Sequence, residues 1–308
     1  MTVGLIDVDS HNFPNIALMK LSSWHKSRGD IVEWWWSDMV HYDVVYMSKV
    51  FSFTPDHPEP LNADRIIKGG TGYAIAVENG KEIYRSELDI PLAEEVEHIY
   101  PDYDMYPRFS DTAYGFLSRG CPRGCGFCHV AGKEGRSSRK VADLSEFWTG
   151  QKCIEVMDPN ILACQERDDL LDQLRLSGAT VNFNQGLDIR LMDRDVAELL
   201  GKMRIKRLHF AWDNPSDDLR THFERFSEQY RRKDPAGKMV YVLTNFNSTI
   251  DEDLYRINTL RSLRYDPYVM VYNRESAPPI IRHLQRWCNN KFIFKAEPDF
   301  WKYNPRRT

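Results

Sequence analysis

Three cysteines lie within eight residues, in the run Cys121-Pro-Arg-Gly-Cys125-Gly-Phe-Cys128. This C-x3-C-x2-C loop constrains the chain more than any other feature, because three thiolates on one short loop can wrap one corner of an iron–sulfur cube. A 4Fe-4S cluster usually takes four cysteine ligands, so three leave one iron open to bind something else. An apolar, strand-like stretch at 113–118 comes directly before the loop.

At these residues the chain resembles the radical S-adenosylmethionine (radical SAM) superfamily. That family has an aromatic residue just before the third cysteine, and Phe127 stands there. The resemblance implies that the open iron binds the amino and carboxylate groups of SAM. It further implies that an electron from the cluster cleaves SAM, and that the resulting 5′-deoxyadenosyl radical abstracts hydrogen from a substrate. A reducing partner such as a flavodoxin or ferredoxin is then required.

A zinc site is the competing interpretation of the three cysteines. Structural zinc takes four ligands, so His129 or a more distant residue would have to complete the set. The other cysteines, Cys153, Cys164 and Cys288, are isolated. We expect no disulfide, because nothing in the chain is typical of a secreted protein. A non-catalytic iron–sulfur or zinc scaffold therefore stays open as an alternative.

The composition is that of an ordinary globular protein of about two domains, with 308 residues, 42% of them apolar and 28% charged. No run of about 18 apolar residues occurs, so no membrane span is expected. The first residues lack the basic segment of a signal peptide. Free cysteines and a labile cluster both need a reducing environment, so we expect a cytoplasmic protein.

Charge is distributed unevenly along the chain. Residues 1–108 carry 9 Lys and Arg against 18 Asp and Glu, whereas residues 109–308 carry 32 against 27. The acidic part is unsuited to follow a phosphate backbone. The second part has basic clusters at Arg231–Lys233 and Arg306–Arg307. Short charge runs are most often solvated surface, which is the interpretation we favour here.

The first 108 residues predict a small Rossmann-like or flavodoxin-like α/β domain followed by a connector. A helix is expected at 15–28, where apolar residues recur with a period near 3.6. The connector is rich in turn residues, and Asn79-Gly80 predicts a hairpin within it. Strands with a mostly parallel arrangement are expected at 3–8, 31–36 and 44–48.

Three consecutive tryptophans, Trp34, Trp35 and Trp36, end the second expected strand. Side chains alternate between the two faces of a strand. We therefore expect these rings in the core, on both faces of a central strand. A partner surface is the alternative, because Trp is enriched at protein interfaces.

The first domain also resembles the cobalamin-binding-type domain that many radical SAM enzymes carry. One type of cobalamin domain has an Asp-x-His-x-x-Gly motif after the first strand. Here Asp9 and His11 match, but Pro14 replaces the glycine. Proline removes the freedom that this loop would need. The domain is therefore expected to be degenerate, and cobalamin is not the favoured cofactor. A cobalamin-dependent radical SAM methyltransferase stays open as an alternative.

From residue 109 to 275 a regular strand–helix rhythm predicts a partial (β/α)6 TIM-type barrel, the architecture that the resemblance implies. About 25–35 residues separate successive strands, which suits crossover helices. Six units fit this length, and a closed barrel of eight would need more chain. The segment 276–308 is expected to be an extension that covers the barrel. Its first part, 280–288, predicts an amphipathic helix. The barrel strands are expected at 113–118, 153–157, 180–184, 207–212, 239–244 and 267–272.

All six expected strands end in polar residues, and barrel enzymes place their working side chains at these ends. Asp158 is the candidate acceptor for the SAM ammonium, with Asn160 beside it, and Arg190 suits the SAM carboxylate. Phe127 would lie against the adenine. The ribose diol needs donors and acceptors, for which Gln185, Asp188 and Asn245 are the candidates. Capping of the next turn is the plain alternative role for Asp158 and Asp188. The substrate, whether small molecule, peptide or nucleic acid, does not follow from the sequence.

Overall fold

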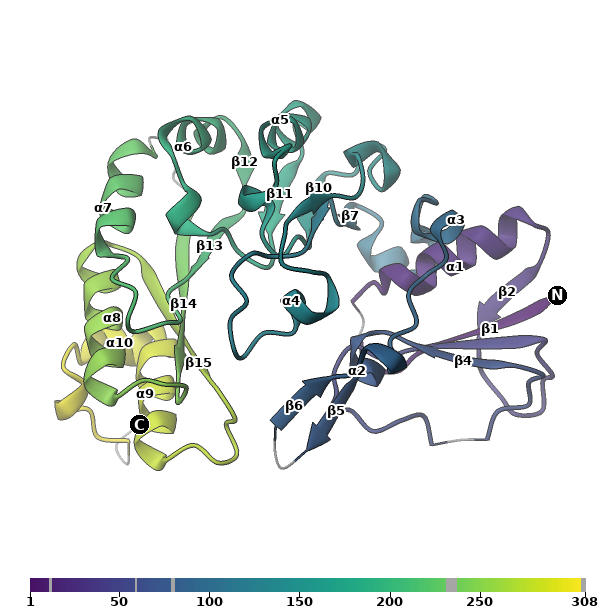
Figure 1. Cartoon of the computed structure of the whole chain (residues 1–308), viewed down its shortest axis with the longest axis horizontal. Helices are drawn as coiled ribbons and strands as arrows, with labels where there is room; N and C mark the ends of the chain where they lie inside the picture. Colours follow the sequence, from purple (N-terminus) through teal and green to yellow (C-terminus); the bar gives the residue numbers. More distant parts are fainter. Residues whose placement is uncertain (11–12, 59, 79–80, 231–236, 306–308) are drawn as a thin grey trace. The chain divides into compact units, whose positions relative to one another are not determined.

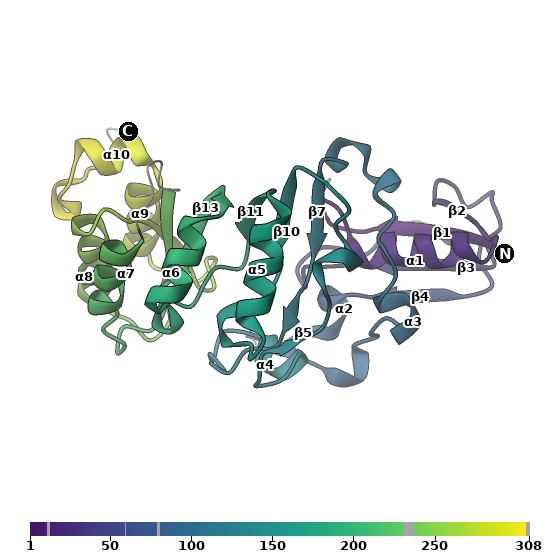
Figure 2. The same cartoon turned by 90° about the horizontal axis from the view of Figure 1, so that it is seen from above.

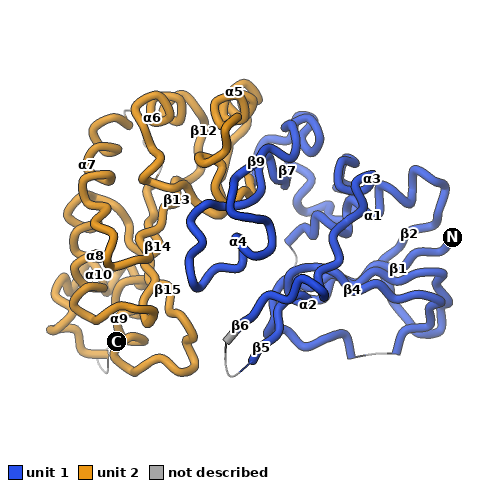
Figure 3. The backbone as a smooth tube through the Cα atoms, viewed as in Figure 1, with its two compact units in different colours: residues 1–155 blue, residues 156–308 orange. Residues whose placement is uncertain are grey.

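The computed structural model describes residues 1–10, 13–58, 60–78, 81–230 and 237–305 (Figure 1). The chain is an α/β protein, and it forms two compact units, Met1–Glu155 and Val156–Thr308 (Figure 3). Among the described residues, no helix is long and apolar enough to cross a membrane.

Unit 1 (Met1–Glu155) begins with the predicted small parallel sheet. Helix α1 (Ile16–Ser27) connects the first two strands, and the Asn15 side chain caps it by accepting from the Leu18 N–H at 3.3 Å. All neighbouring strands pair in parallel. The Rossmann-like order β2-β1-β3-β4 confirms the predicted domain type. The strands are β1 (Thr2–Asp7), β2 (Ile31–Trp34), β3 (Val44–Ser48) and β4 (Ile66–Gly69).

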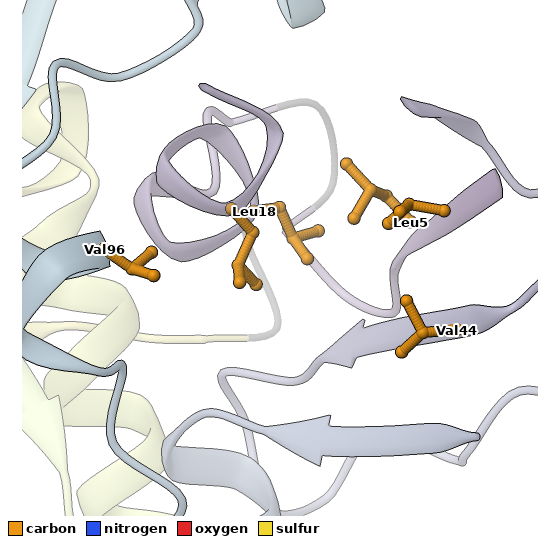
Figure 4. Packing of buried hydrophobic residues seen from close by; sticks show 6 residues of the cluster. Leu5, Leu18, Val44 and Val96 are labelled. Carbon is orange, nitrogen blue, oxygen red and sulfur yellow. The ribbon is translucent and has the colours of Figure 1, made fainter. Parts of the chain in front are cut away.

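One face of this sheet is covered by α1 and by the short helix α3 (Glu94–Glu97) (Figure 4). The alternation within β1 and the helical spacing within α1 bring apolar side chains together there. Each fully buried aliphatic side chain stabilises the fold by about 1.5–3 kcal/mol. The core cluster consists of Val3, Leu5, Leu18, Leu21, Val44 and Val96.

The prediction of three buried tryptophans is wrong for two of them. β2 is an edge strand of the sheet and not a central one. The faces of an edge strand are only partly covered, and Trp34, the last residue of β2, is 38% exposed. The strand expected at 31–36 ends at Trp34, so Trp36 follows it in the chain, and Trp36 is 64% exposed. Trp35 is half-buried and packs beside Tyr42 and Met47.

The connector contains the predicted hairpin, formed by β5 (Ile75–Glu78) and β6 (Lys81–Tyr84) in antiparallel pairing. A helical turn, α2 (Thr71–Ala74), directly precedes β5. Three single-turn helices, Ser86–Leu88, Tyr103–Met105 and Pro107–Phe109, complete the connector.

The remainder of unit 1 contains the strands next to the cysteine loop. Of the expected strand 113–118, β7 covers Thr112–Gly115, and Ser118 begins the separate strand β8 (Ser118–Arg119). β10 (Cys153–Val156) starts where the Cys153 N–H donates to the Asp111 carbonyl at 3.0 Å. A turn at Leu144–Glu146 precedes β10.

Unit 2 (Val156–Thr308) alternates between strand and helix, as the sequence predicted. β11 pairs in parallel with β12, and β13, β14 and β15 form a parallel sheet. The part of the chain that the structure describes forms no closed barrel. In chain order the elements are α5 (Arg167–Ser177), β11 (Thr180–Phe183), α6 (Arg194–Gly201), β12 (Arg204–Ile205), β13 (Arg207–Ala211), α7 (Arg220–Gln229), β14 (Gly237–Thr244), α8 (Ile250–Ser262) and β15 (Asp266–Val271), with single turns at Ile161–Ala163 and Ile189–Leu191.

Helices cover one face of the β13-β14-β15 sheet (Figures 1 and 2). Phe210 on β13 packs against Phe223 and Phe226 of α7, with ring centroids 6.0 and 5.2 Å away. The alternate residues point to the other face, and most of them are half-buried or exposed. This second face carries an aromatic row of His209, Tyr241 and Tyr268.

The C-terminal segment forms α9 (Pro279–Asn289), α10 (Lys291–Ala296) and a turn at Phe300–Lys302. The predicted helix at 280–288 is confirmed. The Asn289 side chain accepts from the Val269 N–H at 2.7 Å and donates to the Val269 carbonyl at 3.0 Å. Both backbone groups of a residue on the edge strand β15 are thereby satisfied.

A buried guanidinium links the carboxyl ends of β13 and β14. Arg256 on α8 is 1% exposed. It donates to the carbonyls of Trp212, Asp213 and Leu243 at 2.6, 3.0 and 3.0 Å. Its charge is paired with fully buried Asp253, 2.5 Å away. Arg256 therefore satisfies carbonyls at the point where two strands end.

Replacing Arg256 with Met is expected to destabilise the protein by about 3–5 kcal/mol, because Asp253 would remain buried without its partner charge. Urea unfolding followed by circular dichroism measures this loss. Arg220→Met is the matched control, since Arg220 forms an exposed ion pair with Glu224 on α7. A loss below about 1 kcal/mol is expected there. Equal losses for the two variants would contradict the role assigned to Arg256.

Candidate functional site

The cysteine loop lies in unit 1, and two paired strands close it at its base. β8 (Ser118–Arg119) pairs in antiparallel register with β9 (Arg139–Lys140), and the loop runs between them through the short helix α4 (Val130–Lys133). Within the loop, Cys121 is half-buried, whereas Cys125 and Cys128 are exposed. The two strands at the base therefore present the three thiols on one short, closed stretch of chain.

Two glycines give the loop its path. Gly120 has φ +91°, and a Cβ there would lie 2.1 Å from the Ser137 carbonyl oxygen. Gly124 has φ +58°, and a Cβ there would lie 3.2 Å from Nη1 of Arg136. Residues that carry a Cβ rarely adopt this backbone conformation. At position 120 there is also no room for a Cβ atom. The N–H of Cys128 donates to the Cys125 carbonyl at 3.0 Å, which closes a tight turn between these cysteines.

Residues just after the third cysteine contact the connector of unit 1. The ring of His129 lies 3.3 Å from the Glu82 carboxylate on β6. Lys133 donates to the Thr71 hydroxyl at 2.8 Å. His129, the nearby candidate for a fourth zinc ligand, is therefore engaged with a carboxylate of the hairpin.

The donor set of the loop fits an iron–sulfur cluster, since three thiols lie on one short loop that is partly open to solvent. The six cysteines form no disulfide. In the ranges described above, no three side chains of His, Cys, Asp or Glu are already gathered as a metal site. The fit thus rests on the donor chemistry and on the backbone of the loop, and not on a preformed ligand cage. Phe127 is half-buried within the same loop.

In unit 2 the structure brings three of the predicted SAM-binding residues together. Asn160 Nδ2 donates to Asp188 at 3.4 Å, and Arg190 Nε donates to the same carboxylate at 2.8 Å. Arg190 also pairs with Asp217 at 3.0 Å. Asp188 caps its turn as well, by accepting from the Arg190 N–H at 3.2 Å. The guanidinium proposed for the SAM carboxylate therefore lies between two carboxylates, one of which the sequence did not single out.

The other predicted SAM-binding residues of unit 2 are Asp158, Gln185 and Asn245. Asp158 is 3% exposed, whereas the Gln185 side chain is exposed. Asn245 has φ +62°, and its side chain donates to the Tyr272 carbonyl at 2.8 Å. Asn273 also has a positive φ. Asparagine tolerates this left-handed conformation better than most residues, so it suits the sharp turns that follow β14 and β15.

Asp213, like Asp217, is a residue that the sequence interpretation missed. It follows β13 and accepts from the Leu243 N–H at 3.2 Å. Burial raises its pKa to about 6, although the positive charges of Arg256 and Arg190 offset part of the rise. A signal existed, because Asp213 stands at the end of a predicted strand. The sequence did not show that the positive charge of Arg190 acts on the Asp213 carboxylate.

Asp9, the first residue of the cobalamin-type motif, is engaged with backbone. It is 1% exposed, and its carboxylate accepts from the N–H groups of Val50 and Phe51, both at 2.8 Å. This carboxylate therefore holds the loop after β3. Several other residues of the sequence interpretation lie outside the described residues, namely His11, Asn79, Gly80, Arg231–Lys233 and Arg306–Arg307.

No protein-family model matches this chain, and no curated protein matches it either.

Asp213→Asn is expected to change how stability depends on pH. The folded-state pKa of Asp213 is raised to about 6 from 3.8, so the folded chain holds this proton more tightly than the unfolded chain. The contribution of this tightly held proton to the free energy of unfolding is complete below pH 3.8, and it is lost as the pH rises through about 6. At pH 7.5 the Asn variant should be more stable than wild type by about 1–2 kcal/mol. At pH 4 this advantage should vanish.

Urea unfolding at both pH values tests this expectation. The exposed Asp218 of the same loop supplies the control Asp218→Asn, which should differ from wild type by less than about 0.5 kcal/mol at both pH values. If Asp213→Asn is more stable than wild type by the same amount at pH 4 and pH 7.5, titration of the Asp213 carboxyl does not cause the difference.

Proposed function

We propose that this chain is a radical SAM enzyme that abstracts hydrogen from its substrate. The observation that carries the proposal is the C-x3-C-x2-C loop, which is pinned at its base by β8 and β9 and has Phe127 before the third cysteine. Cys121, Cys125 and Cys128 would hold a 4Fe-4S cluster through their thiolates. When bound, that cluster supplies the electron for reductive cleavage of SAM to methionine and a 5′-deoxyadenosyl radical.

The proposal also assigns a finer architecture to the chain. Residues 109–275 would form a partial (β/α)6 barrel whose strands are β7, β10, β11, β13, β14 and β15. Residues 1–108 would form a degenerate cobalamin-binding-type domain with its connector, and residues 276–308 the covering extension. Support comes from the parallel pairing of β13, β14 and β15 and from the helices that follow these strands. Barrel enzymes collect their working groups at the carboxyl ends of such strands.

The chain's own residues would bind and orient SAM at those strand ends. Asp158 and Asn160 offer oxygen acceptors for the ammonium group, and both are buried. Arg190 supplies guanidinium donors for the carboxylate, although it would have to share them with Asp188 and Asp217. The ribose hydroxyls would be met by Gln185 and by the amide of Asn245. Exclusion of water around the site protects a radical from side reactions.

Three rival functions are weaker on particular observations. Asp9 is occupied as an acceptor of two loop N–H groups, so it does not support a cobalamin-dependent methyltransferase. Methylthiolation would need a second cysteine triad in the first domain, and residues 1–108 contain no cysteine. Capping of turns explains single polar groups such as Asp188, but a non-catalytic scaffold does not require polar groups after each of several successive strands. The substrate class is not assigned.

Anaerobic reconstitution with iron and sulfide is expected to load about four irons per chain. With dithionite, or with a flavodoxin or ferredoxin as reductant, added SAM should then yield 5′-deoxyadenosine. Cys125→Ala should abolish this product, because two thiolates cannot hold the cluster in the required form. Chromatography of the nucleoside product and an iron assay measure both effects.

Cys153→Ala is the matched control, since Cys153 lies outside the loop and is half-buried on β10. It should retain the wild-type iron content and product. SAM cleavage that survives in Cys125→Ala would overturn the proposed site. Zinc bound in place of iron, with no cleavage, would favour the scaffold.

A further inference from the structure

A row of paired charges runs from helix α1 to the first residue of the cysteine loop, and all of it lies within unit 1. Lys20 on α1 pairs with Glu97 on α3 at 3.2 Å. Arg119 on β8 lies 3.4 Å from the same Glu97 oxygen, and its other terminal nitrogen donates to Glu134 at 3.1 Å. The second oxygen of Glu134 accepts from the Gly120 N–H at 3.0 Å.

Glu134 is held so that both of its carboxylate oxygens are used. Its side chain is 13% exposed, and its backbone carbonyl accepts from Arg139 at 2.7 Å. The neighbouring Gly135 carbonyl accepts from the Cys121 N–H at 3.2 Å. Two consecutive N–H groups at the start of the loop, those of Gly120 and Cys121, are therefore bound by two consecutive residues, Glu134 and Gly135.

The surroundings leave this part of the loop little freedom. The Gly120 backbone lies so close to the Ser137 carbonyl that a side chain would not fit. The Arg119 guanidinium is 3.8 Å above the Phe116 ring, which orients it toward the two carboxylates. Hydrogen bonds to an ionised group are stronger than neutral ones, so loss of the Glu134 carboxylate should loosen the loop at its first cysteine.

We propose that Glu134 is a positioning residue that fixes Gly120 and Cys121, and that it links them through Arg119 and Glu97 to Lys20 on the helix of the N-terminal sheet. The N-terminal domain thereby acts on the conformation of the cysteine loop. The consequence for catalysis rests on the proposed function, whereas the effect on the thiols does not. A negative charge beside the first ligand would also make addition of an electron to a bound cluster harder.

The first test uses the full-length chain, reduced and metal-free, with iodoacetamide as the thiol probe. Mass spectrometry follows alkylation of Cys121 and Cys125 separately. Glu134→Ala should raise the rate at Cys121 by about tenfold, in line with loss of a charge-assisted hydrogen bond. Glu134→Gln should raise it less, because an amide oxygen still accepts from Gly120. Lys20→Met should act in the same direction, since it removes the far end of the row.

The control is Glu95→Gln, which removes an exposed carboxylate on α3 and should leave the rate at Cys121 unchanged. Circular dichroism and the melting temperature report whether each variant folds, and the Gln variant retains the side-chain volume. Unchanged alkylation of Cys121 in both Glu134 variants would overturn the proposal. A change in Glu134→Ala without any change in Lys20→Met would overturn the link to α1.

A second measurement separates positioning from mere structural support. After reconstitution, the midpoint potential of the Glu134→Gln protein should be more positive than that of wild type, because one negative charge is gone. Glu95→Gln should keep the wild-type potential. A wild-type chain that takes up no cluster would refute the proposed function while the alkylation result still stood. An unshifted potential with normal cluster content would count against Glu134.

Discussion

Parallel pairing of strands is the constraint from which the arrangement of polar groups in both units follows. A parallel neighbour can be reached only by a crossover, so each strand is followed by a turn and usually by a helix. The carboxyl ends of adjacent strands therefore meet at one edge of the sheet. In unit 1 that edge holds buried Asp9 and Asn15 beside Ser48. In unit 2 the corresponding ends carry Asn160, Asp188 and Asp213.

Such an edge has to satisfy many backbone groups at once, and the chain uses side chains for this. Arg256 covers three carbonyls at the ends of β13 and β14, and Asn245 ties the turn after β14 to the end of β15. Asn289 serves the exposed side of β15 in the same way. A buried polar group without a partner costs about 1–3 kcal/mol, so these contacts hold the strand ends where ligand-binding residues would need to be.

Much of the fold could be predicted from the sequence because its cause is local. The apolar period of α1, the strand at Val44–Ser48 and the hairpin of β5 and β6 each depend on neighbours a few residues away. The tryptophan prediction was wrong because strand order is not local: β2 is an edge strand, and Trp34 at its end is exposed. Similarly, Asp213 stood at a predicted strand end, but only packing reveals that Arg190 and Arg256 act on it.

The amino-acid order alone shows which chemistry the candidate site can offer: three thiols at a spacing suited to one cluster corner, and polar residues after each predicted strand. Those properties belong to short stretches of chain, so they can be recognised before the fold is known. How these groups are held depends on the packing of the folded chain. Glu134 meets Gly120 because β8 and β9 close the loop, and Arg190 lies between Asp188 and Asp217 because two strand ends converge. The Glu134–Gly120 and Arg190–Asp217 contacts join residues that are 14 and 27 positions apart in the chain, and no local pattern encodes such contacts.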